Sequence, residues 1–167
     1  MKLLGHPIHQ QLVGLPLGIL TSAVIFDVIA LAARNSFLFR MAFWLIGVGL
    51  IAGALAAVFG LMDWIGLPQK TRARRVGAWH AISNVVALTL FAASWLFRRP
   101  SPDAPVGYAL AASFAGICAL LVAGWLGGEL VNRMGVGVDD GANLNAPSSL
   151  SGKPIRSNAK SSGTRAA

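Results

Sequence analysis

Four long apolar runs constrain this chain more than any other feature. They cover residues 12–33, 41–67, 76–97 and 106–131. Each is long enough to cross the hydrocarbon core of a bilayer as an α-helix, which takes about 20 residues. Because 55% of the residues are hydrophobic and only 12% are charged, a water-soluble fold would have to expose most of this apolar surface. The sequence therefore predicts an all-α transmembrane protein.

Short loops join the runs, so we expect each helix to lie antiparallel to the one before it in an up-down four-helix bundle. Residues 1–10 are too polar for a signal peptide, which predicts an uncleaved first span. Pro16 should bend that span. Three runs contain glycines four positions apart, a spacing that lets helices approach closely in lipid. These pairs are Gly14 with Gly18, Gly49 with Gly53, and Gly124 with Gly128.

The composition changes at Asp139 to Ser, Gly, Asn, Ala and basic residues. Such a segment buries too little apolar surface to offset its chain entropy. We expect a four-span transmembrane domain over residues 1–138 and a disordered basic tail over residues 139–167.

The basic residues indicate topology rather than nucleic-acid binding. The net charge is +8, but no basic and aromatic motif of a nucleic-acid-binding module is present. Ten Lys and Arg residues fall on the side that holds both termini, and four fall on the other side. The positive-inside rule then predicts a multi-pass protein of the bacterial cytoplasmic membrane with both termini in the cytoplasm. Cys118 is the single cysteine, so neither an internal disulfide nor a multi-cysteine zinc site can form.

Polar residues embedded near the run ends should gather at one end of such a bundle. The side chains expected there are His6, His9, Asp63, His80, Asn84 and Glu129. Asp63 and Glu129 lie near helix C-termini, where a negative charge needs compensation. Glu129 and Arg133 are four positions apart and suit a helical ion pair, and Asp63 could reach the 70–75 loop.

This polar cluster has two interpretations. It can be a structural cluster that fixes how the helices pack, with His80 bonding Asp63. Alternatively it is a functional site, because ionisable residues within membranes are energetically costly. Imidazole binds iron, copper and zinc, and helical bundles host both metals and haem. In that case His6, His9, His80, Asp63 and Glu129 are candidate metal ligands. His6, His9, His80 and Met134 are candidate ligands of a b-type haem.

Asp27 stands apart from this cluster, nearer the opposite end of the first run. Its expected partners are Arg34 on the same helix, or Ser94, Arg98 or Tyr108 across the bundle. A proton or ion role is the alternative to packing.

Several motifs together resemble a bacterial membrane-protein family known as domain of unknown function 2231. They are HPIHQQLVGLPLG, GLMDW, the arginine loop leading into WHAISN, and GWLGGELVNRMGVGV, and the resemblance covers about residues 5–138. It implies an integral membrane protein with four helices and no established activity. Some relatives are joined to Rieske-type iron–sulfur domains, which implies electron transfer nearby. Gln10 and Met134 depart from the family pattern, where proline and histidine are frequent. The positions that match it are His6, Pro7, His9, Pro16, Asp27, Asp63, His80, Asn84, Gly127, Gly128 and Glu129.

No arrangement of nucleophile, base and oxyanion donors and no phosphate-binding glycine loop is present, which favours a non-enzymatic role. The leading hypothesis is a small membrane protein of undefined biochemical role whose polar cluster is its functional centre. One alternative is a haem- or metal-binding electron-transfer subunit, and the other is a structural or assembly subunit of a membrane complex.

Overall fold

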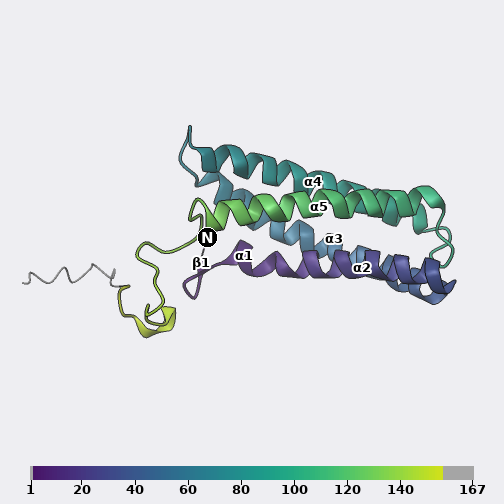
Figure 1. Ribbon diagram of the computed structural model, residues 1–167, viewed down its shortest axis with the longest axis horizontal. Coiled ribbons are helices and arrows are strands. Elements are labelled where there is room, and N and C mark those ends of the chain that lie inside the picture. The colour runs from purple at the N-terminus through teal and green to yellow at the C-terminus, as the bar shows by residue number, and fades with distance from the viewer. Residues whose placement is uncertain (1, 156–167) are drawn as a thin grey trace, which may run out of the picture.

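Four long helices lie side by side along the long axis of the protein (Figure 1). The computed structural model describes residues 2–155. Its helices are α1 (Ile8–Leu12), α2 (Gly14–Ala33), α3 (Ser36–Ile65), α4 (Arg72–Arg98) and α5 (Gly107–Asn132). Short elements flank them, namely β1 (Lys2–Leu3), β2 (His6–Pro7) and the 3₁₀ helix η1 (Ser149–Ser151). Four helical segments are long and apolar enough to cross a membrane, which confirms the predicted all-α membrane bundle.

Helices α1 and α2 form a single span, Ile8–Ala33, with a local irregularity at Val13. Pro16 lacks an amide proton and leaves the carbonyl of Leu12 without its helical donor. Val13 nevertheless keeps helical dihedral angles, and its amide still donates to the carbonyl of His9. The proline therefore interrupts one hydrogen bond without ending the helix.

Polar caps place the starts of α3 and α4 earlier than the apolar pattern does. The Asn35 side chain accepts from the Phe37 amide, and the Thr71 hydroxyl accepts from the Arg74 amide. Asn and Thr at these positions satisfy amides that a helix start leaves free. As a result α3 begins at Ser36 and α4 begins at Arg72, each ahead of its apolar run.

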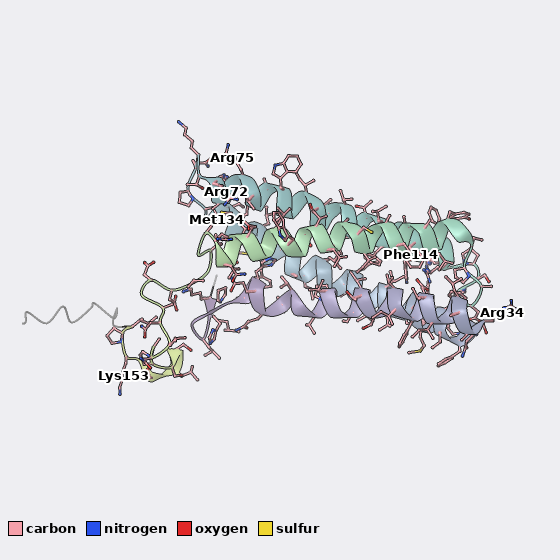
Figure 2. All side chains as sticks on the ribbon, in the orientation of Figure 1. Arg34, Arg72, Arg75, Phe114, Met134 and Lys153 are labelled. Atoms are coloured by element: carbon pink, nitrogen blue, oxygen red, sulfur yellow. The ribbon has the colours of Figure 1, made fainter. Side chains whose placement is uncertain are left out.

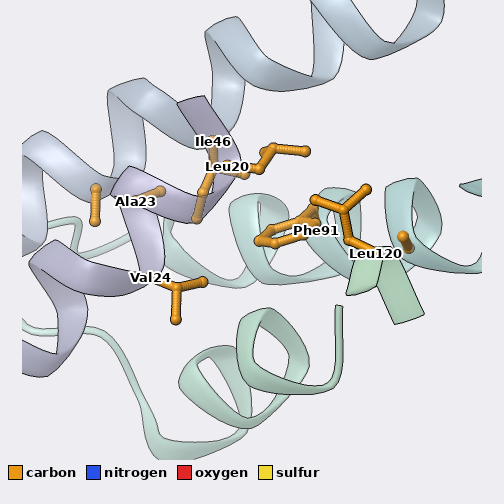
Figure 3. Close-up of a cluster of buried hydrophobic side chains, with 8 residues drawn as sticks. Leu20, Ala23, Val24, Ile46, Phe91 and Leu120 are labelled. Carbon is orange, nitrogen blue, oxygen red and sulfur yellow. The ribbon is translucent and has the colours of Figure 1, made fainter. Parts of the chain in front are cut away.

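The core is narrow and runs between two helical hairpins. Helix α2 packs on α3, and α4 packs on α5. Between them Leu20, Ile46 and Phe91 are fully buried (Figure 3). Large apolar side chains point outward all along the helices, and Ile51 and Leu121 are each more than 60% exposed. An apolar exterior around a small core is the distribution that lipid requires.

The two hairpins are repeats of one pattern. The first comprises α1, α2 and α3, and the second comprises α4 and α5. Buried or site-forming positions on their first helices correspond at a separation of 71 residues. These pairs are His9 with His80, Pro16 with Ala87, Leu20 with Phe91, Ala23 with Ser94, and Asp27 with Arg98. Positions on the second helices correspond at 67 residues. These pairs are Ala42 with Ala109, Ile46 with Ser113, Gly49 with Gly116, Ala56 with Ala123, and Gly60 with Gly127.

A pseudo-two-fold axis therefore runs along the bundle between the hairpins. Residues that are equivalent and also touch each other lie on such an axis. His9 contacts His80 near one end of the bundle, and Asp27 contacts Arg98 near the other. We call the first the termini end, where α1 and α4 begin, and the second the distal end, where α2 and α4 finish.

In both hairpins, glycines on one helix leave room for large side chains of the neighbouring helix. A Cβ atom on Gly49 would lie 2.6 Å from Leu20. In the second hairpin, a Cβ atom on the equivalent Gly116 would lie 3.0 Å from Phe91, which is equivalent to Leu20. Of the predicted glycine pairs, Gly49 and Gly53 meet a neighbouring helix closely, whereas Gly14, Gly18 and Gly124 have open space.

The segment after α5 folds back against the start of the chain. Gln10 donates to the carbonyl of Val136, and Lys2 forms an ion pair with Asp139. The prediction of a disordered tail over residues 139–167 stays a prediction, and its part beyond residue 155 lies outside the described residues.

Candidate functional site

Two histidines from opposite hairpins meet at the termini end. His9 belongs to α1 and His80 to α4, and their ring centroids are 6.2 Å apart with the ring planes nearly perpendicular, at 84°. Both side chains are half-buried. The sequence predicted both histidines at this end, and the structure brings them into contact.

Each imidazole is bound to the second helix of its own hairpin in the same way. His9 Nδ1 lies 2.9 Å from the carbonyl oxygen of Ala56, and His80 Nδ1 lies 2.9 Å from that of Ala123. Four residues after each alanine comes a glycine. A Cβ atom on Gly60 would lie 2.7 Å from the His9 ring, and one on Gly127 would lie 3.2 Å from the His80 ring. The missing side chains let each ring reach the helix backbone.

These hydrogen bonds determine which nitrogen carries the proton. A carbonyl oxygen can only accept, so Nδ1 of each ring must be the donor. In the neutral imidazole Nε2 then has a free lone pair. The amide nitrogen of Asn84 donates to the His80 carbonyl at 2.9 Å and lies 3.2 Å from His80 Nε2. The Nε2 atom of His80 is thus an acceptor, as the tautomer requires.

The other predicted ligands have different surroundings. His6 is exposed in β2, 3.4 Å from the Ser149 hydroxyl. The Glu129 carboxylate contacts Arg72 at 3.2 Å, whereas the sequence suggested Arg133, four residues later and just past the end of α5. Met134 follows α5 at the termini end and is half-buried (Figure 2).

The predicted metal ligands do not form one cluster. Within residues 2–155, no three His, Cys, Asp or Glu side chains are close enough to hold an ion together. Asp63 is half-buried at the end of α3. What remains of the predicted site is the histidine pair with Asn84 beside it.

Arg74 satisfies the free backbone carbonyls at the C-terminal end of α3. Its guanidinium donates to the carbonyls of Trp64, Ile65 and Leu67, the shortest bond being 2.8 Å to Leu67. It also stacks 4.5 Å from the Trp64 ring, whose indole nitrogen donates back to the Arg74 carbonyl. A cation at this position satisfies carbonyls that the helix end leaves free. The arginine loop therefore has a structural role in joining the two hairpins.

The distal end contains a fully buried ion pair. Arg98 donates through two nitrogens to the two Asp27 oxygens at 2.7 and 2.6 Å, and neither side chain has any solvent exposure. Ser94 and Ser113 each lie 3.1 Å from the same guanidinium. Arg98 and Ser94 were among the partners predicted for Asp27, whereas Ser113 was not. The spacing of 71 residues between His9 and His80 recurs between Asp27 and Arg98, and this signal could have paired them.

Four membrane-spanning helices around an axial pair of histidines define a small polytopic membrane protein, with a polar site at one end. The family described as "Predicted membrane protein (DUF2231)" matches residues 5–140, and the chain belongs to that family. Neither the comparison with curated proteins nor that with solved structures gives a match.

Proposed function

We propose that this protein binds a transition metal at its histidine pair, His9 and His80, as a subunit of an electron-transfer or other membrane complex. The observation that supports the proposal is the fixed tautomer of both rings. Metal-binding histidines usually donate their second ring N–H to a carbonyl or carboxylate, which orients the ring and makes the other nitrogen more basic. Both imidazoles meet this condition, and both belong to spanning helices.

The site faces the cytoplasm in this proposal. The positive-inside rule puts the side with ten Lys and Arg residues in the cytoplasm, against four on the other side. The histidine pair lies at that end, so a metal would be exchanged with the cytoplasm rather than with the cell exterior. The same rule supports a bacterial cytoplasmic-membrane location.

Two imidazoles can bind a metal either as a bare ion or as the iron of a haem. The helices below the pair favour the bare ion, because Leu88, two turns after His80, fits so closely that a Cβ on Gly53 would lie 2.6 Å from it. A porphyrin extends over more than one helical turn and would need this layer to open. The two sources share imidazole ligation and differ in their absorption spectra.

The test is a metal analysis and an absorption spectrum of the full chain, purified in mild detergent from membranes. Bound metal or a Soret band that disappears in His80→Asn and His9→Asn supports the proposal. Asparagine suits this purpose because its amide can keep the bond to the helix carbonyl while the Nε2 ligand is lost. His6→Asn is the matched control. A preparation that takes up neither metal nor haem would leave the structural or assembly subunit as the function.

A further inference from the structure

The pseudo-two-fold axis through the histidine pair limits how a metal can be held there. His9 and His80 are equivalent positions of two repeats, and each ring is bound to an equivalent alanine carbonyl beside an equivalent glycine. An ion shared by the two rings must lie close to the axis, since neither repeat offers a second position of this kind. One ion per chain follows from that symmetry.

We infer that this ion is monovalent copper, held in linear two-coordination by Nε2 of His9 and Nε2 of His80. The inference rests on the proposed metal-binding function and names the metal. Three features favour monovalent copper: the number of ligands, the separation of the two rings and the charge of the bound complex.

The ligand number excludes the common geometry of zinc. Zinc in proteins almost always has four ligands in a tetrahedron. Within residues 2–155, no third His, Cys, Asp or Glu side chain joins the two histidines. Imidazole also binds copper well, and monovalent copper, with its filled d shell, accepts two nitrogen ligands in a line.

The separation of the ring centroids equals the one that a linear bridge through both Nε2 atoms requires. A metal–nitrogen bond of about 2.0 Å, plus roughly 1.1 Å from a ring nitrogen to the ring centre, gives about 6.2 Å between the centres of two collinear imidazoles. At a tetrahedral angle the same bonds give about 5.1 Å. The observed separation is 6.2 Å. Perpendicular ring planes, here at 84°, also keep the ring hydrogens of a linear pair apart.

The charge of the complex suits a half-buried position in a membrane. Two neutral imidazoles leave the charge of the ion unchanged. The cost of burying an ion in a low dielectric rises with the square of its charge, so a divalent ion without anionic ligands costs about four times as much as a monovalent one. No Asp or Glu makes a three-member ligand group with the histidines among residues 2–155, so the ligand set found there carries no negative charge.

Asn84 is the group that must yield when copper binds. Its amide nitrogen lies 3.2 Å from His80 Nε2 and also donates to the His80 carbonyl. Copper would take the Nε2 lone pair that the amide now faces, so the amide group must move away from Nε2 when the ion binds. The equivalent position in the first repeat is Val13, which offers no such competitor.

The test is a copper titration of the full chain in detergent under argon. Copper is supplied with ascorbate, and the chromogenic ligand bicinchoninate competes for it. We expect one Cu(I) per chain, and X-ray absorption with two nitrogen neighbours at about 2 Å. His9→Asn and His80→Asn should each weaken binding at least 100-fold, and His6→Asn should not change it. Zn²⁺ should bind at least 100-fold more weakly than Cu(I).

Two kinds of result would overturn the inference. Tight binding of Zn²⁺ or haem that depends on both histidines, or three or more neighbours around copper, would remove linear Cu(I) and leave the metal-binding function standing. Failure of Cu(I), Zn²⁺ and haem to bind, with the Asn variants as thermally stable as the wild type, would remove both.

Discussion

Asp27 and Arg98 occupy equivalent positions of the two hairpins, 71 residues apart, and form a two-pronged ion pair with no exposure to solvent. Because the two positions are related by the pseudo-two-fold axis, one repeat supplies the anion and the other the cation. Ser94 and Ser113 complete the hydrogen bonding of the guanidinium. The pair joins the hairpins at the distal end, as the histidines do at the termini end.

Removing one member of this pair should destabilise the bundle strongly. Asp27→Ala leaves the Arg98 guanidinium buried without its counter-ion, a change that typically costs about 3–5 kcal/mol. Ser113→Ala removes the hydroxyl contacts with Arg98, Asp27 and the Leu110 carbonyl, and we expect a loss of about 1 kcal/mol. The measurement is reversible unfolding in mixed micelles. Equal losses for the two variants would contradict the role given to the ion pair.

Exchanging the two charges tests the pseudo-symmetry itself. In the double variant Asp27→Arg with Arg98→Asp, the carboxylate and guanidinium meet at the same point on the axis with their helices exchanged. We expect this variant to recover about half or more of the loss of the single variants, as coupled neighbours do. Recovery should be incomplete, because the serines lie at positions 94 and 113 while their counterparts are Ala23 and Ile46.

Much of the fold could be predicted from the sequence because lipid imposes a simple rule. In lipid no water satisfies the backbone, and a long apolar run meets all of its own backbone hydrogen bonds only as a helix. The ends were harder to predict, since Asn35 and Thr71 set the starts of α3 and α4 through side-chain caps that hydropathy does not register.

The site was predicted only in part. Helix order in an up-down bundle was enough to place His9 and His80 at one end. Partners were not predictable in the same way, because helical spacing suggested Arg133 for Glu129, whereas its carboxylate pairs with Arg72 on the adjacent helix. The carbonyls of Ala56 and Ala123 as histidine acceptors depend on the depth of the groove above Gly60 and Gly127, which sequence spacing does not specify.

Alanine at the glycines beneath the histidines should have graded effects. Gly60→Ala places a Cβ 2.7 Å from the His9 ring and must displace it, whereas Gly127→Ala places one 3.2 Å from His80 and needs a smaller shift. We expect a loss of about 1–3 kcal/mol for the first and less for the second. Gly124→Ala is the control, since nothing lies within 4 Å of its added atom. Thermal unfolding in detergent gives the order, and a destabilised Gly124→Ala would contradict this account.

An exposed ion pair at the distal end should give the protein an acid-dependent contact between its hairpins. Arg40 Nε donates to Asp103 at 2.5 Å, and this hydrogen bond lowers the pKa of the Asp103 carboxyl below its usual value. A lowered folded-state pKa means that the contribution is present above the unfolded-state pKa and is lost as pH falls through the folded-state pKa. The stability difference between wild type and Asp103→Asn should therefore be constant at neutral pH and vanish in strong acid. A difference that grows on acidification would contradict it.

Asn84→Val should tighten copper binding if the second histidine must give up a hydrogen bond to bind the metal. The substitution copies the first repeat, where Val13 occupies the equivalent position, so it is compatible with this type of helix contact. It removes the donor 3.2 Å from His80 Nε2. A net hydrogen bond is worth about 1 kcal/mol, which corresponds to roughly fivefold higher affinity in the bicinchoninate competition. Asn84→Asp is the contrasting variant, because it adds a carboxylate beside the same nitrogen and should favour divalent ions such as Zn²⁺ over Cu(I).

Weaker Cu(I) binding by Asn84→Val would mean that the asparagine is itself a ligand, and the linear site would then have to be abandoned.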